Sequence, residues 1–240
     1  MVDLKEEQRY RQLRRLAKEL HIPMHEAFLE LEVRDKAGRL ILHHRQRSHS
    51  WTRNAYNLLF CELAGKDGDD GTFGAGLLSL KDTSEAIKSG SAPACITYAT
   101  SVLQYMKSVD STTAGYRGGV GDATQGIQVG TGTNAESFED YALQTLIANG
   151  TGAGQLSYIA SEVHSISYAA LTLKNELVRY FNNNSGGGIG VNEVGLVALG
   201  SAGSSQTRFM TTRDKLPATV TVPDTGQLKV TYTIQLTYPA

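Results

Sequence analysis

The chain has 240 residues, of which 40% are hydrophobic. This apolar content can bury the core of one large β domain or of two small domains, and it excludes a disordered protein. Residues 1–60 hold 12 Lys and Arg against 8 Asp and Glu, and residues 61–240 hold 11 against 16, so a basic head precedes an acidic body. The net charge of −1 gives no overall attraction to nucleic acid or to an anionic membrane.

The first 65 residues predict a helix, a β-hairpin and a second helix. Apolar residues recur at helical spacing after a capping-box pattern at Asp3 and Glu6, until Pro23 ends the run. Alternation over residues 29–33 and 40–44, around turn residues at 35–38, predicts the hairpin. The second helix is expected after Ser50, with apolar residues at helical intervals and a C-terminal cap at the end (Trp51, Ala55, Leu58, Leu59, Leu63 and Gly65).

The first helix also has a basic face, formed by Arg9, Arg11, Arg14, Arg15 and Lys18. Such a face is either simply solvated, with Glu6, Glu7 and Glu19 offsetting its charge, or docks on an acidic neighbour. The sequence leaves both interpretations open.

Residues 66–125 are expected to form a glycine-rich connecting region. Residues 66–76 indicate a loop, and a weak helix or irregular stretch is expected through Ala86 and Ile87. Residues 96–106 fit helical and strand spacing equally well.

Residues 126–240 predict an antiparallel β-sandwich. Leu228, Val230 and Tyr232 begin the clearest alternation, which places apolar side chains on one face of a strand and polar ones on the other. Many short strands separated by turns are typical of sandwiches. The strand-like runs are 127–130, 141–148, 155–160, 164–173, 177–181, 189–199, 208–216, 218–222 and 227–238. The predicted fold class is therefore mainly β, an antiparallel sandwich preceded by a small α/β module, with boundaries at 1–65, 66–125 and 126–240.

The segment IQVGTGTNA, residues 127–135, fits the G-x-G-x-x-[G/A] pattern of dinucleotide-binding loops. Such a loop also needs a βαβ unit and an acidic residue about 20 positions later. No Asp or Glu lies between Asp140 and Glu162, and the following turns are too short for crossover helices. We therefore expect Ile127 and Val129 to face a core, Gly130 to begin a turn at a sheet edge, and no cofactor to bind.

Other candidate sites are equally weak. His43 and His44 would point to opposite faces of a strand, His49 adds no complete zinc set, and residues 67–71 (DGDDG) lack the register of a calcium loop. The chain has no G-x-S-x-G, and the adjacent carboxylates Glu139 and Asp140 should diverge. We expect no metal site, no catalytic residues and no enzymatic activity.

Two further features concern the cysteines and the loop at residues 182–190. Cys61 and Cys95 are too few for a disulfide framework, so free, buried thiols are expected. The segment NNNSGGGIG, residues 182–190, predicts a tight reversal between two paired strands. MVDLKEEQRY at the start has no apolar h-region, and no run approaches a membrane span, so we expect a soluble protein made in a reducing cytosol.

Three motifs occur in order: V-G-T-G-T at 129–133, N-N-S-G at 183–186 followed by V-x-E-x-G-L at 191–196, and R-D-x-L-x-x-x-V-T-V-P at 213–223. Together they resemble a module of structural proteins of tailed bacteriophages, over about residues 126–238. Residues 31–60 also resemble segments that precede this module. The resemblance implies a virion protein, synthesised in the host bacterial cytoplasm, and it transfers no catalytic residues.

Within that group the expected role is a tail or distal-tail component that assembles as a homo-oligomer beside other virion proteins. A capsid-associated decoration or head-fibre protein is one alternative, and a module that binds host-surface glycan is another. Sheet edges, turn loops and the first helix are the expected contact elements, with Trp51 and Arg53 as interface anchors. No membrane or specific nucleic-acid partner is expected.

Overall fold

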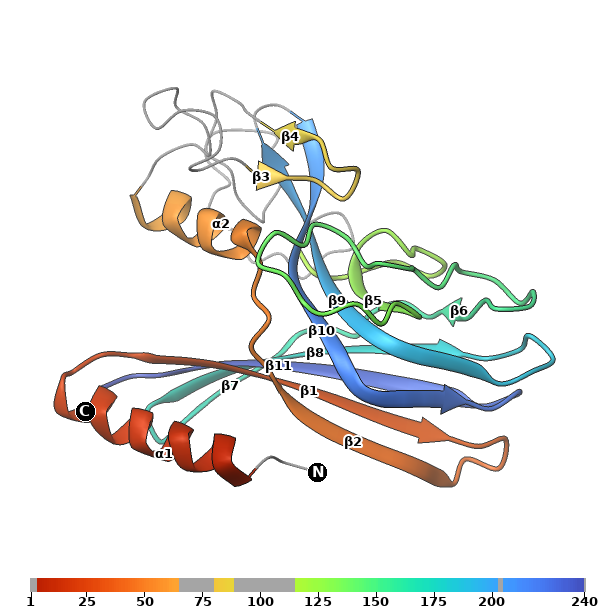
Figure 1. The fold of residues 1–240 in the computed structure, drawn as a ribbon, viewed down its shortest axis with the longest axis horizontal. Helices are drawn as coiled ribbons and strands as arrows, with labels where there is room; N and C mark the ends of the chain where they lie inside the picture. The colour runs from red at the N-terminus through yellow and green to blue at the C-terminus, as the bar shows by residue number, and fades with distance from the viewer. Residues whose placement is uncertain (1–3, 65–79, 89–114, 203–204, 240) are drawn as a thin grey trace.

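A computed structural model describes residues 4–64, 80–88, 115–202 and 205–239 (Figure 1). It is mainly β, with antiparallel sheets and two helices in this part of the chain, which confirms the predicted fold class. The helices are α1 (Leu4–Glu19) and α2 (Arg53–Ala64), and the strands are β1 (Met24–Arg34), β2 (Leu40–Ser48), β3 (Leu80–Lys81), β4 (Ile87–Lys88), β5 (Gly126–Gly130), β6 (Ser157–Tyr158), β7 (Ser165–Ala169), β8 (Thr172–Asn182), β9 (Ile189–Ala202), β10 (Ser205–Val222) and β11 (Gln227–Thr237).

Two sheets pack face to face and enclose the main core. Sheet A has the order β2-β1-β11-β8-β6, with β7 also paired to β8, and sheet B has the order β10-β9-β5. The buried residues of β11 are Leu228, Val230 and Tyr232, as their alternation predicts. They contribute to one apolar cluster with residues of sheet B such as Val194 and Leu196.

The hairpin β1-β2 belongs to the sandwich. Strand β1 pairs with β11 over its whole length, from Met24 opposite Thr237 to Arg34 opposite Gln227. Leu29 and Leu31 are fully buried in the common core. The predicted division at residues 65 and 126 therefore does not separate two cores, because a pairing between strands 200 residues apart leaves no local signal in the sequence.

The glycine-rich segment 182–190 does not join two paired strands, contrary to prediction. Strand β8 lies in sheet A and β9 in sheet B, so this loop crosses from one layer of the sandwich to the other. Buried Asn183 holds the crossing: its Oδ1 accepts a hydrogen bond from Ser185 N–H (3.0 Å), and its Nδ2 donates to Gly187 O (2.7 Å). The same turn residues that tolerate positive φ, such as Gly186 at +81°, serve either connection.

Three other local predictions are wrong. Residues 141–148 form an irregular loop with one bridge at Leu146, because their backbone groups bond to β5 and to side chains. The weak helix or irregular stretch expected through Ala86 and Ile87 includes a small β3-β4 hairpin, closed by Asp82, whose Oδ1 accepts from Ser84 and Ala86 N–H. Trp51 precedes α2 and bridges to Thr212 of β10.

Helix α1 lies along the outer face of sheet A (Figure 1). A charged network fixes it there: Arg14 and Arg47 both donate to Glu26 Oε1, at 2.8 and 2.6 Å, and Arg47 also donates to Glu7 (2.6 Å). Burial alone would raise the pKa of Glu26, but these hydrogen bonds outweigh it and hold the pKa below its ordinary value. The basic face of α1 is therefore partly used within the molecule.

Strands β9 and β10 continue past the core towards α2 and the β3-β4 hairpin (Figure 1). Asn54 of α2 ties these elements together, since its side chain donates to Lys81 O (2.7 Å) and to Met210 O (3.3 Å). The predictions for residues 66–76 and 96–106, the Gly65 cap, and the side chains of Cys61 and Cys95 fall outside the described part of the chain.

Candidate functional site

The three motifs that carry the phage resemblance meet around one buried carboxylate, Glu193 of β9. Its Oε2 accepts from Arg213 Nε of β10 at 2.7 Å, and its Oε1 accepts from Gly132 N–H at 3.0 Å. The N–H groups of Gln144 and Thr145 donate to the same carboxylate at 3.1 and 2.8 Å. Glu193 and Arg213 are both buried. A buried ion pair of this kind persists only when its remaining polar atoms are satisfied, as they are here.

This arrangement decides the dinucleotide question for residues 127–135. Strand β5 pairs antiparallel with β9 rather than opening a parallel βαβ unit. The backbone N–H of Gly132, which a phosphate would need, donates to the chain's own Glu193. Successive N–H groups of this kind form a natural anion site, and a carboxylate of the protein fills it. Ile127 and Val129 are buried in the core, and β5 forms an edge of sheet B, both as predicted.

The guanidinium of Arg213 extends the cluster into the loop that follows β5. It donates to Asp140 Oδ2 at 2.9 Å and to the backbone oxygens of Ala135 and Asn134, both at 3.2 Å. The neighbouring Glu139 turns away and pairs with Arg53 of α2. The adjacent carboxylates diverge, as expected, and each fixes the loop to a different element.

The remaining motif residues also serve packing. A Cβ on Gly195 would lie 2.8 Å from Met210 Cε and 2.9 Å from Leu143 Cδ2, so a larger residue would force these two side chains to shift. Asn183 of N-N-S-G donates to Val222 O, in the V-T-V-P segment, at 2.8 Å. In this chain the three motifs thus supply contacts that hold the sandwich and its loops together.

Arg179 of β8 is a second buried cation, and sequence reasoning missed it. Its guanidinium donates to five backbone oxygens and has no salt bridge to a described carboxylate: Gly119, Asp122, Gln125, Ile127 and Ile159 accept at 2.6 to 3.1 Å. Burial lowers its pKa to about 10, so it stays charged at neutral pH. Its role is to fasten residues 118–127 to sheet A. The available signal was a charge inside the apolar run LVRYF, and Glu193 in IGVNEVGLVAL shows the same signal.

Asp214, next to Arg213 in the motif, is fully buried where β2, β10 and β11 meet. Ser48 Oγ and Tyr232 OH donate to its Oδ2, at 2.8 and 2.5 Å. Burial nevertheless raises the pKa of Asp214 to about 7, because removal from water penalises the charged form more than these two hydrogen bonds favour it. This carboxyl therefore changes its charge near neutral pH.

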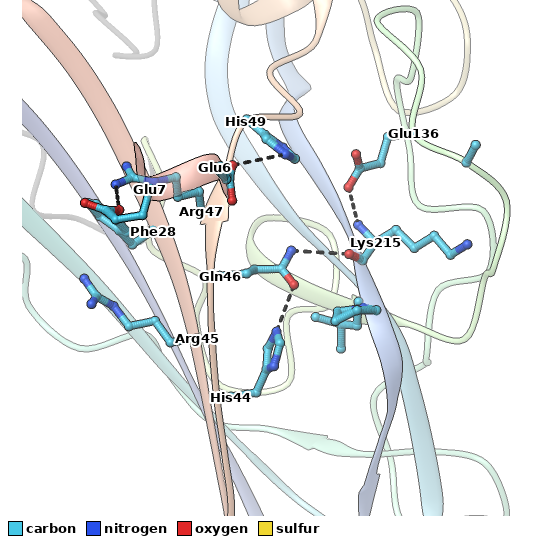
Figure 2. Close-up of a pocket in the computed structure, with 13 residues that line it drawn as sticks. Glu6, Glu7, Phe28, His44, Arg45, Gln46, Arg47, His49, Glu136 and Lys215 are labelled. Carbon is cyan, nitrogen blue, oxygen red and sulfur yellow. Dashed lines mark hydrogen bonds and ion pairs between the residues drawn. The ribbon is translucent and has the colours of Figure 1, made fainter. Parts of the chain in front are cut away.

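A groove of about 510 Å³ opens beside this position, between the start of α1, strand β2 and strand β10 (Figure 2). Its polar groups bond to one another: Gln46 Nε2 donates to Lys215 O (3.3 Å), and Lys215 N–H donates to Glu136 (2.7 Å). His44 bonds to Gln46 at 2.9 Å. Among the residues that line the groove, none is a serine or cysteine that a base would activate.

The histidines behave as predicted for structural positions. His44 is satisfied within the hairpin, whereas exposed His43 lies on the opposite face and pairs with Glu30 at 2.8 Å. Within the described ranges, no group of three or more His, Cys, Asp or Glu could hold a metal ion. The proposed calcium-like segment 67–71 lies outside those ranges.

Apolar side chains are exposed on several elements, and three of these are described below. Helix α1 exposes Leu13 and Leu16, and α2 exposes Tyr56 and Leu59. The third element is the β7-β8 hairpin, where every residue of β7 is exposed. The last surface differs from the two helices because it lies at a sheet edge, where backbone groups are also accessible.

The predicted interface anchors are partly engaged within the chain. Trp51 packs against His25, with ring centroids 4.9 Å apart. Arg53 pairs with Glu139 and lies over the ring of Phe138, 5.1 Å from its centroid. Neither residue projects as a free anchor.

Comparisons with family models, curated proteins and solved structures find no match for this chain. Neither helix in the described part is long and apolar enough to cross a membrane.

Proposed function

We propose that this protein is a non-enzymatic structural component of a tailed-bacteriophage virion, in the tail or its distal apparatus, and that it assembles as a homo-oligomer. The observation that carries the proposal is the convergence of the three resemblance motifs on the Glu193–Arg213 pair and the neighbouring crossing loop. Motifs that meet in space are the residues a shared fold requires, so this contact supports treating the resemblance as one module.

The distribution of polar groups fits a scaffold. Hydrogen bonds of three buried charged residues hold loops to the sheets; these residues are Glu193, Arg213 and Arg179. Exposed apolar residues lie instead on the surface, among other places on α1, α2, the β2 edge and the β7 edge. A protein that repeats in a ring or tube needs rigid loops and surfaces that other copies bury.

The proposal is tested by mass spectrometry of particles purified from the source that encodes this chain, with heads and tails separated before digestion. Peptides of this chain should occur in the tail fraction at a constant ratio to other tail proteins. Peptides confined to the head fraction would favour a capsid-associated role, and peptides found only in the soluble lysate would refute the virion assignment.

A further inference from the structure

Strand β7, Ser165–Ala169, forms an unprotected edge of sheet A. It pairs with β8 on one side, and within the described residues no strand pairs with its other side. Exposed edges are normally blocked by charged side chains, proline or bulges, because their free N–H and C=O groups accept another strand. The β7 sequence, SISYA, has none of these protections.

The opposite edge of sheet A shows the contrast. Strand β2 carries His43, Arg45 and Arg47 on one face. Exposed Arg45 is a charged side chain of the kind that blocks an edge strand, whereas Arg47 is buried against Glu7 and Glu26. Charge therefore disfavours self-pairing at β2 and permits it at β7.

The turn after β7 determines which backbone groups face outward. Ala170 and Leu171 have φ of +47° and +63°, as in a two-residue type I′ turn, so Ala169 and Thr172 close the hairpin as a hydrogen-bonded pair. Hydrogen bonding alternates along an antiparallel pair, so Ile166 and Tyr168 direct their N–H and C=O groups away from β8. These two residues supply the free bonding groups of the edge.

We propose that β7 pairs antiparallel with β7 of a second copy, about a twofold axis at Ser167. This register forms two equivalent pairs, each with Ile166 of one copy opposite Tyr168 of the other. In each pair the free backbone groups of the two residues face each other. It uses all five residues of the strand. Pairs of an aromatic and a β-branched side chain are favourable across strands.

The side chains of this edge support the same contact. Ile166 and Tyr168 are 68% and 59% exposed. Their register with Asn175 and Leu173 places them on the core-facing side of sheet A, beyond the part of that face that sheet B covers. Tyr168 lies 6.1 Å from Tyr238, centroid to centroid. Pairing of two copies would bring these apolar patches side by side across the axis.

The contact defines a dimer that closes about its twofold axis, so a ring of such proteins would need further contacts on other surfaces. It rests on the proposed function only for its biological setting. A cysteine cross-link tests the register. In the proposed dimer, Ser167 faces its own copy in a non-hydrogen-bonded pair, with Cα atoms about 4.5 Å apart, which suits a disulfide. Ser167→Cys should therefore give a covalent dimer on mild oxidation of the full chain.

Ser165→Cys is the matched control. Its two copies would lie about 14 Å apart at about 3.4 Å per residue, too far for a disulfide. The native chain, with Cys61 and Cys95, gives the baseline. A dimer yield from Ser167→Cys no greater than from Ser165→Cys would overturn the proposed register.

Sedimentation velocity tests the edge itself. Ile166→Pro removes an outward N–H but leaves the bonds between β7 and β8, so it should weaken dimerisation at least tenfold while far-UV circular dichroism stays unchanged. Ile166→Lys should act similarly through like-charge repulsion, whereas Ile41→Lys on the β2 edge should leave the dimer intact. A native chain that stays monomeric over a 100-fold rise in concentration, or dimers that both Ile166 variants retain, would refute the proposal.

These outcomes are separable from those of the proposed function. A chain present in tails but without the Ser167 cross-link would retain the function and lose the β7 contact. A chain that dimerises through β7 but is absent from particles would retain the contact and lose the function.

Discussion

Replacing Glu193 with glutamine should destabilise the protein more than any exposed charge substitution. The change keeps the volume of the side chain but removes the charge that Arg213 and three backbone N–H groups share. Loss of one partner of a buried pair costs roughly 3–5 kcal/mol, and hydrogen bonds to charged groups are each worth about 1.5–3 kcal/mol. Arg213 keeps its bond to Asp140, so we expect a loss of about 3 kcal/mol in the free energy of unfolding.

Urea denaturation followed by circular dichroism measures this loss. The control is Glu32→Gln, which removes the partly exposed pairs with Lys229 (3.1 Å) and Arg34 (3.2 Å) on the outer face of sheet A and should cost less than about 1 kcal/mol. Hydrogen exchange should accelerate at the amides of Gly132 and Thr145 in Glu193→Gln alone. Equal destabilisation by the two variants, or unchanged exchange at these amides, would refute the view that Glu193 organises the loop after β5.

Three further substitutions test the other buried groups. Arg179→Lys keeps the charge, but a lysine cannot bond to all five backbone oxygens that Arg179 reaches. Limited proteolysis at residues 118–125 should therefore increase several-fold. An unchanged digestion pattern would contradict the role of Arg179 in fastening these residues to sheet A. For Asp214, the folded pKa of about 7 exceeds the ordinary value of 3.8, so the folded state binds the extra proton between these values. Its contribution to stability is present below about pH 4 and declines as pH rises to 7, by an amount on the order of 4 kcal/mol. Denaturation series should show this decline in the native protein and not in Asp214→Asn; parallel pH profiles would argue against it. Gly132→Ala places a Cβ against the Glu193 carboxylate and should lower the melting temperature by several degrees, whereas Gly187→Ala has open space and should be neutral. Equal melting temperatures would show that the loop adapts.

Local structure that depends on a pattern within one short segment could be predicted from the sequence. The alternation around Leu228 and Val230 gives the buried face of β11, and Pro23 follows the end of α1 within a few residues. Turn residues, by contrast, identify a reversal without identifying its partner strands. The sequence of the crossing loop after Asn182 therefore predicts a hairpin, because its Asn and Gly residues suit a hairpin turn and a crossing between two sheets equally well.

The charged clusters could not be predicted from local patterns. Glu193 bonds to Gly132 and to Arg213, positions 61 and 20 residues away, and only the stacking of β5, β9 and β10 brings them together. The pairing of β1 with β11, which makes the N-terminal hairpin part of sheet A, could not be predicted from local patterns either. A lone charge within an apolar strand, as at Arg179 and Glu193, is the sequence feature that marks such a cluster.

The most direct test of the proposed virion role is an image reconstruction of intact particles purified from the source that encodes this chain. We expect density that fits the two-sheet sandwich at threefold or sixfold positions along the tail, with several copies in contact. Density spread over the icosahedral shell would contradict the tail assignment, and a particle without this density would contradict the structural role itself.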